Sequence, residues 1–484
     1  MRTKHRKAEP HARAVVWLVV GSLVLAAAPP ARAQCDPREL VKLIASDAAA
    51  GDRFGTSVAV DGDTTAVGVP YDDHSNRTDA GSAYVFVRSA GVWTVQAKLT
   101  ASDAAPGDYF GVSVAVSGDT AVVGAGCDDH TGGNCAGSAY VFVRSGGIWT
   151  QQAKLTASDA SQYNAFGHRV SLSGDTAAVG ALGYRNQTGS AYVFVRSGGV
   201  WRQQAKLTAS DAAAFDYFGY SVFISSDTVV IGAYEDDHAA GTDAGSAYVF
   251  VKPAGGWGDM TETAKLTASD AAAGDKFGVS VSVSGDTAVV GALFDTHAGG
   301  YQAGSVYVFV NYSGAWIEQA KLTASDAAAS DYFGVSICVS DDTTVIGAYG
   351  RDLSGVTNAG SAYAFMRSGG VWTQQAKLTA SDAAASDYFG YAVTVSGDTA
   401  VIGAYADDHA GGTDAGSAYV FDLCSTPGDL DGDGNVDLDD FLRFADCLNG
   451  PGVAYAVGCG AADLEGAGDG DVDLADFAVF QAAF

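Results

Sequence analysis

Hydrophobic and polar residues alternate along most of the chain, in short runs separated by glycine-containing turns. In residues 113–125, "SVAVS" and "TAVVGA" flank the turn "SGDT"; in residues 138–155, "SAYVFV" and "IWTQQAKL" flank "RSGG". Alternation with a period of two predicts β-strands, and short turns with glycine predict hairpins. Each stretch predicts one hairpin, and the two stretches together predict two hairpins, or four strands, in one repeat.

The pattern repeats at a nearly constant interval. The dipeptide "FG" occurs in the same context seven times, and successive copies are 56, 56, 52, 59, 56 and 56 residues apart. The copies begin at Phe54, Phe110, Phe166, Phe218, Phe277, Phe333 and Phe389. Seven repeats of four strands predict an all-β, seven-bladed β-propeller. A β-solenoid is the alternative, although its coils are normally much shorter.

The two ends of the array predict a closed ring. The first "KLIAS", residues 42–46, precedes the first "FG", whereas the last repeat stops after its third strand at residues 417–423. We expect the N-terminal strand to complete the last blade and so to remove exposed sheet edges. Aligning both ends on an intact hairpin puts Cys35 beside Cys424, which predicts a disulfide that clasps the ring.

Four of the remaining cysteines lie in pairs that are close in sequence. Cys127 and Cys135 bracket one loop, and Cys447 and Cys459 lie near the C-terminus, so we expect each pair to form a local disulfide. Cys338 falls on a first strand and is expected to be a small buried hydrophobic residue.

The segment "DYFGVSVAVSGDTAVVGA", followed by "AGSAYVF", resembles the FG-GAP repeat, which is related to the propeller of integrin α subunits. The resemblance covers roughly residues 39–424, and residues 34–424 are the predicted propeller domain. The resemblance implies a propeller of the binding or adhesion type. It does not identify the ligand, because this fold serves many unrelated tasks. The integrin calcium motif between the first two strands is absent, because that connection is only "SGDT".

The chain of 484 residues carries 56 acidic and 27 basic residues, a formal net charge of -29. This charge argues against binding nucleic acid, which requires a basic surface. Residues 1–33 resemble a signal peptide: the basic "MRTKHRK", an apolar run, and an Ala31–Ala33 cleavage motif. We therefore expect a secreted, extracellular or cell-surface protein without a membrane span.

The long connections should lie together on one face, and they carry acidic residues and histidines. The triplet "DDH" occurs in four of them, and Asp295-Thr296-His297 is a partial copy. Calcium binding by these loops and simple capping of turns by aspartate are both open readings. Tyrosines at the loop starts are candidates for glycan binding. The candidate binding face is Asp72, Asp73, His74, Asp128, Asp129, His130, Asp236, Asp237, His238, Asp407, Asp408, His409, Tyr234, Tyr349 and Tyr405.

The C-terminal segment contains a calcium-binding loop. After a linker at residues 425–428, "DLDGDGNVDLDD" places oxygen-bearing side chains at loop positions 1, 3, 5, 7, 9 and 12, with glycine at position 6. Its predicted Ca²⁺ ligands are Asp429, Asp431, Asp433, Asn435, Asp437 and Asp440. A second, less regular loop offers Asp463, Asp469, Asp471, Asp473 and Asp476.

Two such loops, each followed by a short predicted helix, resemble a dockerin across residues 429–484, and so predict a small α-helical calcium-loop domain. Dockerins bind cohesin domains, which implies a cohesin-like partner. Positions 10 and 11, which usually recognise the partner, are here Leu438-Asp439 and Leu474-Ala475, unlike the small polar residues of the family.

We therefore expect a secreted, non-catalytic binding or adhesion protein that recognises an extracellular protein or glycan with its propeller. The sequence contains no catalytic motif, and each cluster of aspartate and histidine in the propeller is repeated, whereas a catalytic site normally occurs once. The alternative is a glycan-binding or hydrolytic component of an extracellular polysaccharide-degrading assembly.

Overall fold

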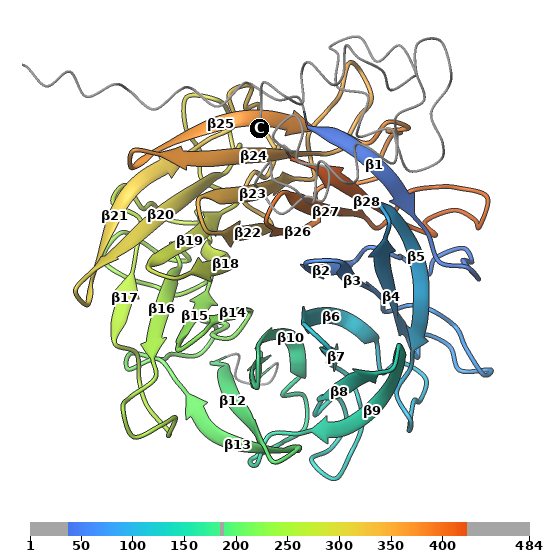
Figure 1. The fold of residues 1–484 in the computed structure, drawn as a ribbon. Coiled ribbons are helices and arrows are strands. Elements are labelled where there is room, and N and C mark those ends of the chain that lie inside the picture. The colour runs from blue at the N-terminus through green and yellow to red at the C-terminus, as the bar shows by residue number, and fades with distance from the viewer. Residues whose placement is uncertain (1–36, 184–187, 424–484) are drawn as a thin grey trace, which may run out of the picture. The chain divides into compact units, whose positions relative to one another are not determined.

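Seven four-stranded sheets surround a central axis in the computed structural model, which describes residues 37–183 and 188–423 (Figure 1). Adjacent strands are antiparallel, and the first strand of each sheet lies nearest the axis while the fourth lies at the rim. The predicted seven-bladed propeller is confirmed. The described residues contain no helix, and hence none long and apolar enough to cross a membrane.

The blades are numbered in chain order. Blade 1 contains β2 (Ser57–Asp61), β3 (Thr64–Val69), β4 (Ser82–Ser89) and β5 (Val92–Leu99); blade 2 contains β6 (Phe110–Ser117), β7 (Thr120–Ala125), β8 (Ser138–Ser145) and β9 (Ile148–Leu155). Blade 3 contains β10 (Phe166–Ser173), β11 (Thr176–Ala181), β12 (Ser190–Ser197) and β13 (Val200–Leu207); blade 4 contains β14 (Ser221–Ser225), β15 (Thr228–Ala233), β16 (Ser246–Val251) and β17 (Ala264–Leu266). Blade 5 contains β18 (Phe277–Ser284), β19 (Thr287–Ala292), β20 (Ser305–Tyr312) and β21 (Ala315–Leu322); blade 6 contains β22 (Ile337–Ser340), β23 (Thr343–Ala348), β24 (Ser361–Ser368) and β25 (Val371–Leu378). Blade 7 contains β26 (Ala392–Ser396), β27 (Thr399–Ala404), β28 (Ser417–Asp422) and the N-terminal strand β1 (Arg38–Leu43).

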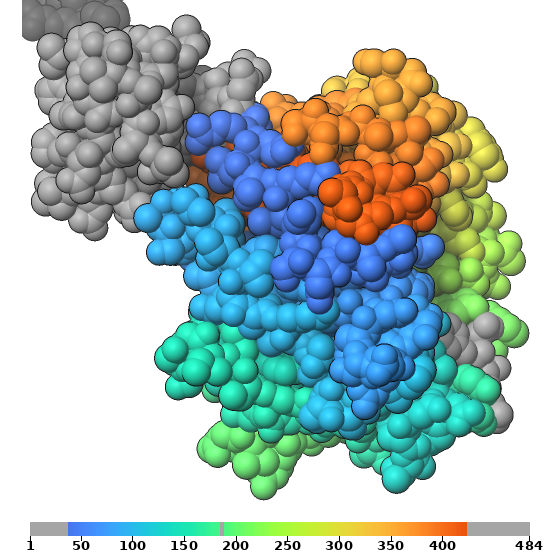
Figure 2. Space-filling model, turned by 90° about the vertical axis from the view of Figure 1, so that its right-hand side faces the viewer, coloured from blue at the N-terminus to red at the C-terminus, as the bar shows by residue number. Residues whose placement is uncertain are grey.

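The ring closes as the sequence predicted. Strand β1 pairs antiparallel with β28, and Arg38 lies opposite Asp422 while Leu43 lies opposite Ala418. Figure 2 shows the blue N-terminal segment packed against the orange-red last blade. This pairing brings the two ends of the propeller together; Cys35 and Cys424, which we expect to form a disulfide there, lie outside the described residues.

Hydrophobic side chains fill the space between neighbouring blades. Phe110 of the second "FG" is fully buried and makes edge-to-face contacts with Tyr140 and Phe142, at ring-centroid distances of 5.5 and 6.0 Å. The corresponding phenylalanine in every blade makes the same two contacts. The repeat is apolar because each copy supplies one wall of two interblade cores.

Serine side chains join the inner strands of neighbouring blades. Each inner strand is the edge of its own sheet, so its backbone groups that point away from that sheet need other hydrogen-bond partners. Ser57 Oγ donates to the Gly111 carbonyl oxygen at 2.9 Å, and Ser113 Oγ accepts from the Val170 amide nitrogen at 3.0 Å. The recurrent serines of "SVAVS" therefore stabilise the wall of the central channel.

Candidate ligand-binding surface at the channel mouth

The long connections lie on one face of the propeller, as predicted. The link between blades 1 and 2 donates two backbone hydrogen bonds to the long loop of blade 1, from Gly107 N to Thr78 O at 3.0 Å and from Tyr109 N to Asp79 O at 3.2 Å. Similar hydrogen bonds join most other links to the preceding loop. The loops consequently support one another and build a continuous surface on this face.

The first aspartate of each triplet is buried within its blade. Asp128 is only 3% exposed, and its carboxylate accepts hydrogen bonds from Ser138 Oγ at 2.6 Å and Tyr140 OH at 3.2 Å. Lys154 Nζ lies 2.8 Å from the same carboxylate. The equivalent Ser, Tyr and Lys surround Asp236 and Asp407, and Lys98 Nζ lies 2.8 Å from Asp72. These four carboxylates hold the base of their loops and are not presented to a partner at the surface.

The second aspartate and the histidine hold the loop itself. Asp129 Oδ1 accepts from the Cys135 amide at 2.7 Å; His130 Nδ1 accepts from the Gly132 amide at 3.0 Å, and its Nε2 lies 3.0 Å from the Gly137 carbonyl oxygen. These contacts define a neutral imidazole that donates from Nε2. The carboxylate contact recurs at Asp73, Asp237 and Asp408, and the Nε2 contact at His74, His238, His297 and His409.

These hydrogen bonds explain why "DDH" recurs: its side chains stabilise the turns of the long loops, which was the structural alternative considered from the sequence. Across residues 37–183 and 188–423, no three His, Cys, Asp or Glu side chains are arranged to hold a metal ion. The predicted calcium ligands at residues 429–476, and the predicted Cys447–Cys459 pair, lie outside the described residues.

A second carboxyl group is buried beside each of several triplets. Asp108, the residue two before Phe110, is 2% exposed and accepts a hydrogen bond from the Ala105 amide at 2.6 Å. Burial, reinforced by the nearby Asp128 carboxylate, raises the pKa of Asp108 from 3.8 to about 6. The pKa is likewise about 6 at Asp52 and Asp216, and is raised at Asp275, Asp331 and Asp387.

We expect Asp108→Asn to stabilise the protein at pH 7.5 by about 1–2 kcal/mol, and by less at pH 5. A carboxyl whose folded-state pKa is raised binds its proton more tightly when folded. Its contribution to stability is therefore present below pH 4 and is lost as the pH rises through 6. Blade 3 has Asn164 at this position, so an amide is compatible with the fold. Thermal melts of both proteins from pH 5 to 7.5 measure the difference.

The exposed Asp129, whose carboxylate also accepts one backbone N–H, is the matched control, because Asp129→Asn reports the effect of an amide at the surface of the same loop. A stability difference between Asp108→Asn and the wild type that does not change between pH 5 and 7.5 would contradict the prediction.

Cys127 and Cys135 lie together, as their spacing suggested, but as thiols rather than as the expected disulfide. Burial, followed by a hydrogen bond with Cys135, raises the pKa of Cys127 to about 12. Cys338 is buried, as expected, and its Sγ lies 3.7 Å from the Val395 carbonyl oxygen.

A belt of half-buried tyrosines lies where the long loops meet the inner strands. Tyr388 stacks on Tyr405 with centroids 5.4 Å apart, and Tyr332 stacks on Tyr349 at 5.2 Å. Burial and the neighbouring tyrosines raise the pKa of Tyr349 and of Tyr405 to about 12, so their hydroxyls remain protonated at neutral pH. This tyrosine belt consists of Tyr71, Tyr109, Tyr217, Tyr220, Tyr234, Tyr332, Tyr349, Tyr388, Tyr391 and Tyr405.

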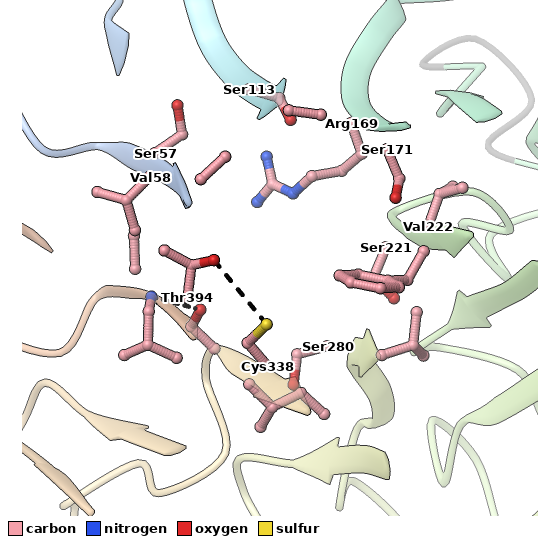
Figure 3. A pocket seen from close by; sticks show the side chains of 18 of the residues that line it. Ser57, Val58, Ser113, Arg169, Ser171, Ser221, Val222, Ser280, Cys338 and Thr394 are labelled. Carbon is pink, nitrogen blue, oxygen red and sulfur yellow. Dashed lines mark hydrogen bonds between the residues drawn. The ribbon is translucent and has the colours of Figure 1, made fainter. Parts of the chain in front are cut away.

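The tyrosine belt contributes to two connected cavities. The central channel between the inner strands has a volume of about 650 Å³ (Figure 3), and a second cavity of about 400 Å³ lies at its mouth. Arg169, Tyr220 and Tyr391 line both cavities. Volumes of this size and a wall of aromatic rings with a few polar groups are typical of small-molecule and glycan subsites.

The sequence identified only part of this surface. Tyr234, Tyr349 and Tyr405, which were candidates because each begins a long loop, lie in the tyrosine belt. The first aspartates of the triplets were also candidates, but they are buried at the base of their loops. Sequence reasoning missed Tyr109, Tyr217, Tyr332 and Tyr388, which share the position just before "FG". The signal available was that this position varies among copies while the following Phe-Gly does not.

The fold and its mouth define a seven-bladed β-propeller with an aromatic, cavity-bearing face. The family model for the FG-GAP repeat matches residues 37–86, 93–142, 149–194, 201–250, 260–309, 316–365 and 372–421, and the chain belongs to this family. No curated protein matches it.

Proposed function

We propose that this chain is a secreted, non-catalytic binding protein whose propeller recognises its ligand at the channel mouth. The observation that carries the proposal is the tyrosine belt beside the two cavities. Tyrosine offers a broad apolar face and a polar hydroxyl with little loss of conformational entropy, and it is therefore common at recognition surfaces. The FG-GAP propeller is a binding and adhesion fold, which agrees with this role.

A glycan is the ligand that this surface favours over a protein. The tyrosines border a recess rather than a flat patch, and a tyrosine hydroxyl can both donate and accept a hydrogen bond. Hydrolysis of the glycan is less well supported, because glycosidases use two carboxyl groups. Among the described residues that line the two cavities, Asp61 is the sole carboxylate, and it accepts a hydrogen bond from the Gly118 amide at 2.6 Å.

The C-terminal segment, in this proposal, docks the protein in a calcium-dependent manner. Its support is the sequence of the first loop, in which six oxygen ligands and the turn glycine occupy the expected positions. The partner in that case is a cohesin-like domain that tolerates leucine at position 10. The propeller would then present a glycan site to whatever surface the docking module selects.

We expect the full chain to bind members of a glycan array, and Tyr405→Leu to weaken that binding by about tenfold. Leucine is the residue at this position in blades 3 and 5 (Leu182 and Leu293), so the substitution removes the aromatic face but keeps a side chain that the fold accepts. Tyr312→Leu is the matched control, because Tyr312 is 56% exposed on a rim hairpin outside the tyrosine belt.

Binding at the mouth should persist in EGTA, whereas docking through the C-terminal segment should not. An array without binding, or equal loss in Tyr405→Leu and Tyr312→Leu, would refute recognition of glycans at the mouth.

A further inference from the structure

One blade differs from the others at the inner strand. The second residue after "FG" is serine in blades 1, 2, 4, 5 and 6 and alanine in blade 7, but it is Arg169 in blade 3. The preceding residue there is His168, where other blades have valine, threonine or tyrosine. In Figure 3 the Arg169 guanidinium extends into the channel, whereas the serines stay at its wall. A binding site is normally unique, so this break in the repeat is where a ligand-specific contact is expected.

Within residues 37–183 and 188–423, no carboxylate neutralises the Arg169 guanidinium. Its Nη1 donates to the His168 carbonyl oxygen at 3.1 Å, and it lies 5.5 Å from the centre of the Tyr220 ring. It makes no ion pair with any residue that the structure describes, although the chain has a net charge of -29. Among the described residues, one of its five N–H donors has a hydrogen-bond acceptor, and we expect the remaining donors to bind an anion.

The surroundings of Arg169 also favour an anion. Arg53 lines the same mouth cavity, lies 4.8 Å from the Tyr71 ring and 5.6 Å from the Tyr405 ring, and likewise makes no ion pair among the described residues. His168 Nε2 is buried without a hydrogen-bond partner there, and burial and the Arg169 charge lower the pKa of His168 well below 6.5. The described residues that line the mouth cavity include no carboxylate.

We infer that the mouth of the channel at blade 3 is a subsite for the carboxylate of an acidic saccharide, held by Arg169 and assisted by Arg53. The inference rests on the proposed function, because it assigns a charge to the glycan. A guanidinium matches a planar carboxylate with two parallel hydrogen bonds, and the sugar ring is left to lie along the tyrosines. A neutral sugar would leave Arg169 without a counter-charge in a half-buried site.

The test uses the full chain and pairs of probes that differ only at the carboxyl group, which is charged in the acid and neutral in the ester. Calorimetry compares trisaccharides of galacturonate, glucuronate and mannuronate with their methyl esters. We expect at least one acid to bind at least about tenfold more tightly than its ester, and Arg169→Ser to remove that preference. Serine is the residue that other blades hold at this position, so the variant restores the repeat and is expected to fold. Arg202→Ser, which changes an exposed arginine on β13 of the same blade, should keep the preference.

The outcomes separate this inference from the proposed function. If acid and ester bind equally, or if Arg169→Ser keeps the preference, the acidic subsite is wrong while glycan recognition at the mouth stands. Equal loss of the preference in Arg169→Ser and Arg202→Ser would also overturn the subsite, because attraction would then be a property of overall charge. Binding of neither these probes nor any array glycan would refute the proposed function.

Discussion

Replacing Gly111 by alanine is expected to destabilise the propeller by about 4 kcal/mol or more, which makes it one of the most damaging single substitutions in the chain. Gly111 has φ +97°, and a Cβ atom there would lie 2.2 Å from the Ser82 carbonyl oxygen and 2.9 Å from the Val69 amide nitrogen. Both atoms belong to the backbone of blade 1, so relief requires the two blades to separate. Thermal and chemical denaturation of Gly111→Ala and of the wild type measure the loss.

Gly107→Ala is the control for the backbone conformation alone. Gly107 also has a positive φ, +79°, but no atom lies within 4 Å of the position a Cβ would occupy. Its expected cost is about 1–2 kcal/mol, the cost of a left-handed conformation for alanine. If both variants lost the same stability, close approach of the blades would not be the reason for the glycine of "FG".

The repeat could be predicted because its causes are local. Alternation and turn glycines identified the strands. The displaced "KLIAS" identified the partner of β28, because the extra strand at the N-terminus can complete the blade that lacks a strand at the other end of the array. The close approach of Gly111 to blade 1 could not be predicted, because a sequence shows that glycine is present but not which backbone lies against it.

The burial of the first aspartate in the acidic loops could not be predicted from the sequence either. As a sequence, Asp128 belongs to an exposed acidic loop; in the structure, Ser138, Tyr140 and Lys154 converge on it from two other strands. In blade 6 the charges of this buried pairing are exchanged. Arg351 replaces the first position of the triplet there and pairs with Asp326 and Asp331, each at 3.0 Å, so a cation occupies the place of a buried anion. Burial of charge follows from such pairings, which span tens of residues.

The channel mouth could be predicted only in outline. Tyr405 was a candidate because it begins a long loop, but the neighbouring Tyr391 lies just before the inner strand β26 and Tyr388 lies in a link between blades. Arg169 was not among the candidates that the sequence pattern identified. Arg169 is a candidate ligand contact because no carboxylate among the described residues pairs with it, and a sequence does not show which side chains lie beside a guanidinium.

Removal of strand β1 is expected to have the other large effect. A chain that starts at Ala45 loses the pairing partner of β28 and the buried Leu43, and it leaves β28 as a long exposed edge. It also loses Lys42 Nζ, which lies 2.6 Å from Asp382 and 2.8 Å from the buried Asp407. An unpaired buried carboxylate costs about 3–5 kcal/mol by itself. We expect the melting temperature to fall by at least about 10 °C, with aggregation at the exposed edge.

A peptide of residues 35–46 tests whether the strand acts by pairing rather than by its attachment to the chain. Added in excess, it should raise the melting temperature of the shortened protein, because it supplies the missing edge by strand addition. The same peptide with Leu43→Asp should not, since its side chain would enter the core between blades 7 and 1. A protein that begins at Cys35 should melt like the full chain. If removal of β1 left the melting temperature unchanged, or if both peptides restored it equally, the ring would not depend on this strand for closure.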